Sequence, residues 1–186
     1  MTDIGDVMRE AYRRGWITTR DGNISVKRNG TLYITPSGHK KYLIGPQDLI
    51  KLPFPAIKTG ANSDAGASIE LEMHWLIQTQ RGVKAVVHLH PTYTIAAMHA
   101  GFNLMHLANQ FVELSRRTTV GPMVPTLDPG SLDLATMTAE ALRLADVVGQ
   151  DRHGVTAKGS DPWSAFEHIE RLEHVCQVVL ASGVKP

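Results

Sequence analysis

The chain of 186 residues has little cysteine, little net charge and no long apolar run. Cys176 is its single cysteine, which excludes an internal disulfide framework and a cysteine-rich zinc site. The formal net charge is +1, and no long block of like charge occurs. Bulk electrostatics therefore give no reason for binding nucleic acid or a membrane surface, and we expect neither partner.

No apolar run approaches the length of a membrane-spanning helix, about 20 residues. The first six residues have neither the basic start nor the apolar stretch of a signal peptide, so we expect a cytoplasmic protein. The length fits one domain over residues 1–186 with a buried core. The paired basic residues Arg13-Arg14, Lys40-Lys41 and Arg116-Arg117 are interpreted as solvated faces rather than phosphate sites.

Apolar periodicity and turn residues predict a mixture of helices and strands. Helices are predicted over 6–14, 69–80, 92–100, 105–114, 132–144 and 163–181, with Ser68 as the cap of the second and Pro162 at the start of the last. Strands are predicted over 24–27 and 31–35, which form a hairpin, and over 83–89, 120–126, 147–148 and 155–157. Residues 58–67 are small and polar and predict a loop, and two prolines exclude a central strand over 52–57. This order indicates an α/β or α+β three-layer domain.

A His-x-His sequence ends the strand predicted over 83–89. His88 and His90 follow Val86 and Val87, whose β-branched side chains suit a strand. Side chains two residues apart on a strand share a face, so both histidines point the same way. Two interpretations stay open: a metal site, or a partly buried and hydrogen-bonded pair.

A catalytic zinc ion commonly has three protein ligands and one open position. His153 is the best candidate for the third ligand, because it lies in a turn between two β-like segments, where proteins often place functional groups. His168 and His174 fall on the amphipathic helix predicted over 163–181, and we interpret them as surface or core residues.

Glu70 and His74 are four residues apart on a predicted helix and so share a face. A carboxylate beside a metal can take a proton from bound substrate and return it. The alternative is an ordinary pair on the helix surface. Small residues in turns can also cradle an anion with their backbone N–H groups, and two segments have this character, 22–25 and 35–38.

Taken in order, five segments resemble the class II aldolase/adducin family, and together they span roughly residues 7 to 182. The matching segments are Asp21–Ser25, Thr35–Gly38, Ser68-x-Glu70 with His74, Ala85–His90 and Arg152–Gly154. The resemblance implies an α/β fold, a three-layer α/β/α domain with a central, mainly antiparallel sheet. It also implies a homotetramer with the site between subunits.

The resemblance also assigns roles to individual residues. It implies Zn²⁺, with Mn²⁺ or Co²⁺ as alternatives, on His88, His90 and His153. Glu70 matches the family's acid/base carboxylate. The residues that match its substrate and phosphate loops are Asn23, Ser25, Thr35, Ser37, Gly38 and Ser68.

The function implied is that of a metal-dependent lyase, an aldolase that cleaves a small, phosphorylated ketose or sugar-acid derivative through a metal-stabilised enediolate. Decarboxylation of a 3-oxo sugar acid phosphate, epimerisation and dehydration are alternatives within the family. A non-catalytic, adducin-like assembly module and a metallohydrolase are alternatives from other classes.

Two positions depart from the family pattern. Ile69 stands where family aldolases carry the second of two serines before the glutamate. The segment 107–113 lacks the tyrosine that protonates the leaving aldehyde, and Phe111 falls near its position. Glu113 is the nearest ionisable group, either a second acid for a dehydratase, decarboxylase or altered aldolase, or a surface carboxylate.

Overall fold

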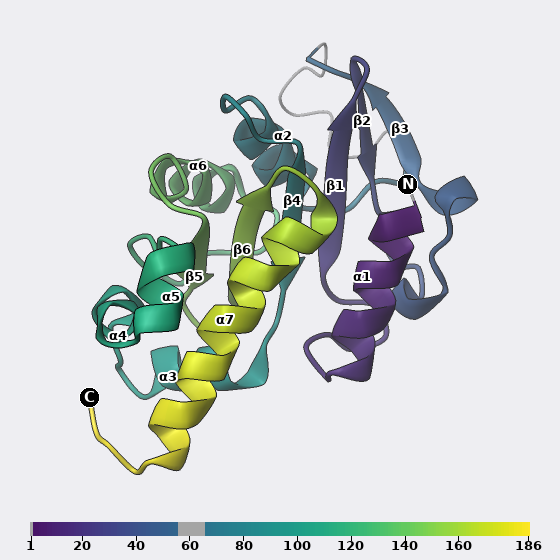
Figure 1. Ribbon diagram of the computed structural model, residues 1–186. Helices are drawn as coiled ribbons and strands as arrows, with labels where there is room; N and C mark the ends of the chain where they lie inside the picture. Colours follow the sequence, from purple (N-terminus) through teal and green to yellow (C-terminus); the bar gives the residue numbers. More distant parts are fainter. Residues whose placement is uncertain (1, 56–65) are drawn as a thin grey trace.

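The computed structural model describes residues 2–55 and 66–186 (Figure 1). Its centre is a six-stranded sheet in the order β3-β2-β1-β4-β6-β5, and every neighbouring pair is antiparallel. The strands are β1 Asn23–Arg28, β2 Thr31–Ile34, β3 Ile50–Pro53, β4 Ala85–Leu89, β5 Val147–Gln150 and β6 Gly154–Gly159. The expected antiparallel sheet is therefore confirmed, and β3, which ends in a proline, lies at its edge.

Helices cover both faces of the sheet, which confirms the three layers (Figure 1). One face packs against α1 Thr2–Arg13, α3 Thr92–His99, α4 Leu104–Gln110, α5 Val112–Arg117 and α7 Pro162–Ala181. The other face packs against α2 Leu71–Gln78 and α6 Leu132–Ala141. Two short 3₁₀ helices, η1 Lys41–Leu43 and η2 Pro46–Asp48, connect β2 to β3.

Strand β4 lies between β1 and β6 and is buried along its whole length. Its side chains alternate between two apolar clusters, since Val87 and Leu89 pack on the α7 side and Val86 packs on the side of α2 and α6. His88 follows the same alternation and shares the face of Val86. The strand therefore carries a histidine into the interior between the sheet and α2.

Several predicted elements differ from the structure. The helix predicted over 6–14 already begins at Thr2, and the helix predicted over 132–144 ends at Ala141. The helix predicted from 69 begins at Leu71 and ends at Gln78, and its N-cap position is Glu70 rather than Ser68. The helix predicted over 105–114 is two helices, because the backbone of Phe111 is extended between α4 and α5. The strand predicted over 120–126 forms only isolated bridges, from Val120 and Val124 to β5.

Helix α7 confirms the predicted start at Asp161-Pro162, since the Asp161 side chain accepts the backbone N–H of Ser164 at 2.9 Å. Cys176 on this helix is fully buried, and burial raises the pKa of its thiol to about 12. The loop predicted over 58–67 lies almost wholly outside the described residues. Within 2–55 and 66–186, no helix combines the length and the apolar character that crossing a membrane requires.

Candidate metal centre

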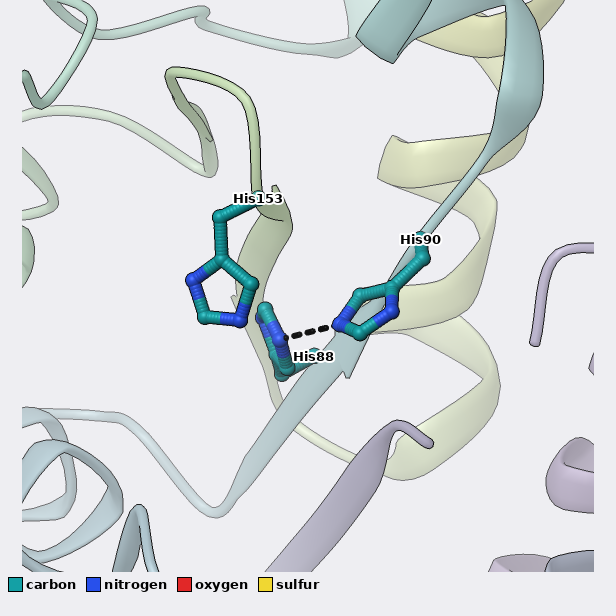
Figure 2. A group of neighbouring side chains, drawn as sticks. All are labelled: His88, His90 and His153. Carbon is teal, nitrogen blue, oxygen red and sulfur yellow. Dashed lines mark hydrogen bonds between the residues drawn. The ribbon is translucent and has the colours of Figure 1, made fainter. Parts of the chain in front are cut away.

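Three histidines meet at the end of β4. Figure 2 shows His88 and His90, on β4 and the residue beyond it, facing His153 from the turn before β6. The Nε2 atoms of His88 and His90 are 2.9 Å apart. One ring nitrogen from each of the three residues lies within 4.8 Å of the others, a spacing that one metal ion could bridge. The structure therefore brings together the three ligands predicted from the sequence.

The sheet fixes the orientation of His88 through its other ring nitrogen. Its Nδ1 lies 3.0 Å from the Thr156 hydroxyl on β6, directly across the ladder. Thr156 in turn donates to the Gln150 side-chain oxygen at 3.3 Å, so its oxygen can accept from His88. This leaves Nε2 of His88 with its lone pair directed at the other two histidines. A partner of this kind is what holds a metal-ligating histidine in one tautomer.

The turn that carries His153 fits closely against the end of β4. The backbone N–H of His153 donates to Gln150, and Arg152 takes a left-handed conformation with φ of 55°. Gly154 follows, and a Cβ atom there would lie 2.6 Å from the His90 ring and 2.6 Å from the Leu89 carbonyl oxygen. A glycine is thus required at this position by close approach, and it lets His153 reach the other ligands.

Burial keeps the three imidazoles neutral. It lowers the pKa of His88 well below its usual value, with help from the neighbouring His90 and His153. Burial also lowers the pKa of His90, and it lowers that of His153 to about 4. Neutral imidazole is the form that binds a metal, so the site is ready for a cation at neutral pH.

Glu70 lies beside this centre as a nearly inaccessible carboxyl. Its Oε2 is 3.4 Å from Nε2 of His88, and its Oε1 is 3.7 Å from Nε2 of His153. Burial raises the pKa of Glu70, although the Asn23 amide and the cation of Lys41 oppose that shift. Among the described residues, Oε1 has no hydrogen-bond partner. One oxygen of Glu70 is thus anchored and the other is free to act.

A chain of hydrogen bonds orients the anchored oxygen. The Asn23 amide nitrogen donates to Glu70 Oε2 at 2.8 Å, and its oxygen accepts from Nε2 of His74. The other ring nitrogen of His74 lies 2.8 Å from the Ser25 hydroxyl. Burial lowers the pKa of His74 to about 3, so the ring is neutral and can serve both partners. Glu70 and His74 are both buried, so the alternative of a helix-surface pair is wrong.

A cavity of about 300 Å³ is lined by His90, His153 and Glu70. The predicted substrate residues that line it are Asn23, Ser37, Gly38 and Ser68, and Ile69 lines it beside them. Ser25 and Thr35 do not line it. Ser25 is fully buried behind Asn23, and the Thr35 hydroxyl accepts the backbone N–H of Ile24. The predicted contact of Ser25 and Thr35 with substrate stays a prediction.

The cavity is also lined by residues that the sequence patterns did not predict to bind substrate. Lys41 lines it and is only 3% exposed, so the interpretation of Lys40-Lys41 as a solvated face is wrong for Lys41. Arg20 and Pro129 line it too. Glu113, the suggested second acid, does not line it and instead faces Arg117 at 3.4 Å on the exposed side of α5.

The donor set suits a divalent cation. Three neutral imidazole nitrogens converge, one of them has a hydrogen-bonded partner behind it, and a cavity lined by His90 and His153 lies beside them. This is the pattern of a catalytic zinc site, three ligands and an open position. The residues therefore fit a metal that activates a substrate.

Comparison with known proteins identifies the class. The class II aldolase and adducin N-terminal domain model matches residues 2–180, and the chain belongs to this family. A crystal structure of l-fuculose-1-phosphate aldolase from Thermus thermophilus has a similar fold, with a TM-score of 0.82 and 25% identity, covering 99% of this chain and 96% of that one.

Two curated relatives give the range of reactions among similar proteins. An L-fuculose phosphate aldolase of Methanococcus maripaludis is 26% identical over 96% of this chain and 94% of its own length. A probable bifunctional methylthioribose-1-phosphate isomerase/methylthioribulose-1-phosphate dehydratase of Nocardia farcinica is 28% identical over 97% of this chain. This chain covers 35% of that longer relative. Aldolases and dehydratases are thus both among the proteins that this chain resembles.

Proposed function

We propose that the protein is a divalent-metal-dependent carbon–carbon lyase that cleaves a small, anionic, sugar-derived substrate by a retro-aldol reaction. The observation that carries this proposal is the convergence of three neutral histidines beside a buried carboxyl, at one cavity. Similarity to sugar-phosphate aldolases supports the reaction class. An assembly module needs no such cavity.

His88, His90 and His153 are the residues that would hold the ion, with Zn²⁺ as the first choice and Mn²⁺ or Co²⁺ as alternatives. A divalent ion bound there supplies Lewis acidity, which stabilises negative charge on a substrate oxygen. The protein orients the His88 ring through Thr156 and holds the His88 and His90 rings in close packing around Gly154.

Glu70 is the group that moves the proton. Its Oε2 is held by Asn23, whereas Oε1 has no hydrogen-bond partner in the described part of the chain. Oε1 is therefore the atom that takes the proton of the substrate hydroxyl and returns it to the carbon freed by bond cleavage. Burial raises the pKa of Glu70, which makes its carboxylate a stronger base than an exposed one. General acid–base catalysis of this kind contributes about 10²- to 10⁴-fold to a rate.

Dehydration is the second candidate, and similarity to the methylthioribulose-1-phosphate dehydratase part of a longer relative favours it. There Glu70 would take a proton from a substrate carbon and give it to the departing hydroxyl group, so that water leaves instead of an aldehyde. Both reactions need the three histidines and the carboxyl. They differ in what leaves the substrate.

A substrate screen of the metal-loaded protein tests the proposal. It should pair phosphorylated and unphosphorylated ketoses with 3-oxo sugar acids, and it should read carbonyl products, double-bond formation and carbon dioxide separately. An aldehyde product supports the aldolase, whereas a dehydrated product supports the second candidate. The His90→Ala protein should lose both metal and turnover, and His99→Ala, an exposed histidine on α3, is the control. A folded protein without metal affinity would overturn the proposal.

A further inference from the structure

Lys41 is a cation buried in the wall of the metal-site cavity. It begins η1, between the loop Thr35–Gly38 and the sheet edge, and only 3% of its surface is exposed. Burial lowers its pKa to about 8, although Asp21 and Glu70 oppose the shift. Burial of a lysine is unusual, because a buried charge is costly unless it has a charged or hydrogen-bonding partner.

The hydrogen bonds of this ammonium group are incomplete. A lysine has three donors, and within the described residues one bond is found, from Nζ to the Pro36 carbonyl oxygen at 2.6 Å. No ion pair within 4.0 Å joins Lys41 to the carboxylates described in the structure. Donors of the ammonium are thus left over in a residue that lines the cavity.

The neighbouring wall of the cavity presents small polar residues that could donate to an anion. Ser37, Gly38 and Ser68 line the cavity on this side. Ile69 follows Ser68, lines the same cavity and is 55% exposed, so an apolar side chain without a hydrogen-bond donor forms part of this wall. The hydroxyl groups here cannot neutralise an anion, and the lysine can.

We propose that Lys41 binds the anionic end of the substrate directly, as the charged anchor of a subsite that it forms with Ser37, Gly38 and Ser68. This inference rests on the proposed function, because it concerns the far end of the substrate whose other end reaches the histidines. The ligand chemistry is a compact anion, a phosphate or a carboxylate. Ile69 reduces the number of donors around that anion, so that the charge of Lys41 carries more of the affinity.

A titration of the metal-loaded protein with inorganic phosphate and, separately, with acetate tests the proposal without any turnover. The variants are Lys41→Met, which keeps the length and apolar stem of the side chain, and Lys41→Arg, which keeps the charge. Lys40→Met is the matched control, because Lys40 is the adjacent lysine and is exposed. Metal content and circular dichroism of each variant establish that it is folded and loaded.

We expect the wild-type protein to bind one of the two anions saturably, and the tighter anion identifies the substrate class. Lys41→Met should weaken that binding about tenfold or more, because a hydrogen bond to a charged group is lost. Lys41→Arg should restore most of it, and Lys40→Met should match the wild type. The substrate KM should rise in Lys41→Met by a similar factor.

Equal anion affinity in Lys41→Met and wild type would overturn the proposal, because the anion would then bind elsewhere, including at the metal. Absence of saturable binding in the wild type would also overturn it. So would a loss in Lys41→Met that Lys41→Arg does not restore, since Lys41 would then only support the Pro36 carbonyl. Failure of the lyase proposal is a separate result, seen as anion binding without turnover on any substrate.

Discussion

Glu70 combines a fixed oxygen with a free one, and this asymmetry makes a sharp prediction. Glu70→Gln should keep the metal, since Glu70 is not one of the three ligands, but should lower turnover by about 10²-fold or more, because the amide cannot take a proton. Metal content and kcat measured on the same preparation check this. Glu72→Gln is a matched control, since Glu72 is also buried but does not line the cavity. Unchanged turnover in Glu70→Gln would remove its role as the base.

Lys41 should lower the stability of the protein. The pKa of Lys41 is 10.5 in the unfolded chain and about 8 in the folded protein. The full free-energy cost of burying the charged Lys41 is therefore present below pH 8. We expect Lys41→Met to be more stable than wild type at pH 7 by about 1–2 kcal/mol, because the relief of charge burial exceeds the loss of one hydrogen bond.

The same reasoning fixes the sign of the pH dependence. From pH 8 to 10.5 the unfolded state of the wild type binds more protons than the folded state, so the advantage of Lys41→Met should shrink as the pH rises. Urea unfolding at pH 7 and pH 10 measures both values. An advantage that grows with pH, or a less stable variant at pH 7, would contradict the assignment of a buried charge.

Among the elements, the β5–β6 turn determines whether the ligands can meet. A Cβ at Gly154 would lie 2.6 Å from the His90 ring and 3.0 Å from the His88 ring, so Gly154→Ala should displace ligands on β4. We expect metal affinity to fall at least tenfold, because outer partners of metal ligands typically control affinity by about 10- to 100-fold. Competition with a chromogenic chelator measures this. Wild-type affinity in the variant would show that β4 can move aside.

Elements whose signals are local could be predicted from the sequence, and those set by packing could not. Alternation predicted the hairpin, an apolar run with β-branched residues predicted β4, and Asp161-Pro162 marked the start of α7. The division between α4 and α5 has no breaker residue, since Phe111 is extended there only in its tertiary setting. Val120 and Val124 form isolated bridges to β5 without extending the sheet. Whether this segment pairs fully with β5 depends on where the fold places it, which no local sequence pattern encodes.

In the candidate site, too, some residues have a local sequence signal and others are placed only by packing. The three histidines and Glu70 carry motif spacing, and the structure brings them together. The burial of Lys41 could not be read from a pair of lysines, because it depends on contacts with Thr19 and Pro36 that only the folded chain makes. The links from His74 through Asn23 to Glu70 join β1 to α2, across more than forty residues of chain.

At the scale of the whole molecule, the predicted homotetramer has a candidate contact surface on α4 and α5. Met105 is 42% exposed and Val112 is 61% exposed, on two helices that pack on each other. We expect a native mass of four chains for the wild type and smaller species for Val112→Glu, because burying a carboxylate in an apolar contact is costly. Leu144→Glu, an exposed position just after α6, is the control. Metal content should not change, since one chain supplies all three histidines.

A monomeric wild-type protein would contradict the tetramer. An unchanged mass in Val112→Glu would instead place the contact elsewhere. The suggestion that Glu113 acts as a second acid depends on this outcome, because Glu113 lies outside the cavity of its own chain. It could reach a site only across such a contact.

The ligands also join parts of the chain that are far apart in sequence. His88 and His90 belong to β4 and its end, and His153 precedes β6, the partner of β4 in the ladder. An ion held by all three must be released before these strands can separate, since the unfolded chain offers no such arrangement. We expect removal of the metal by a chelator to accelerate unfolding in concentrated urea, with little change in the refolding rate. Equal unfolding rates with and without chelator would contradict this. If the metal slows unfolding in this way, the supply of the ion governs how long each molecule stays folded, in addition to how fast it turns over substrate.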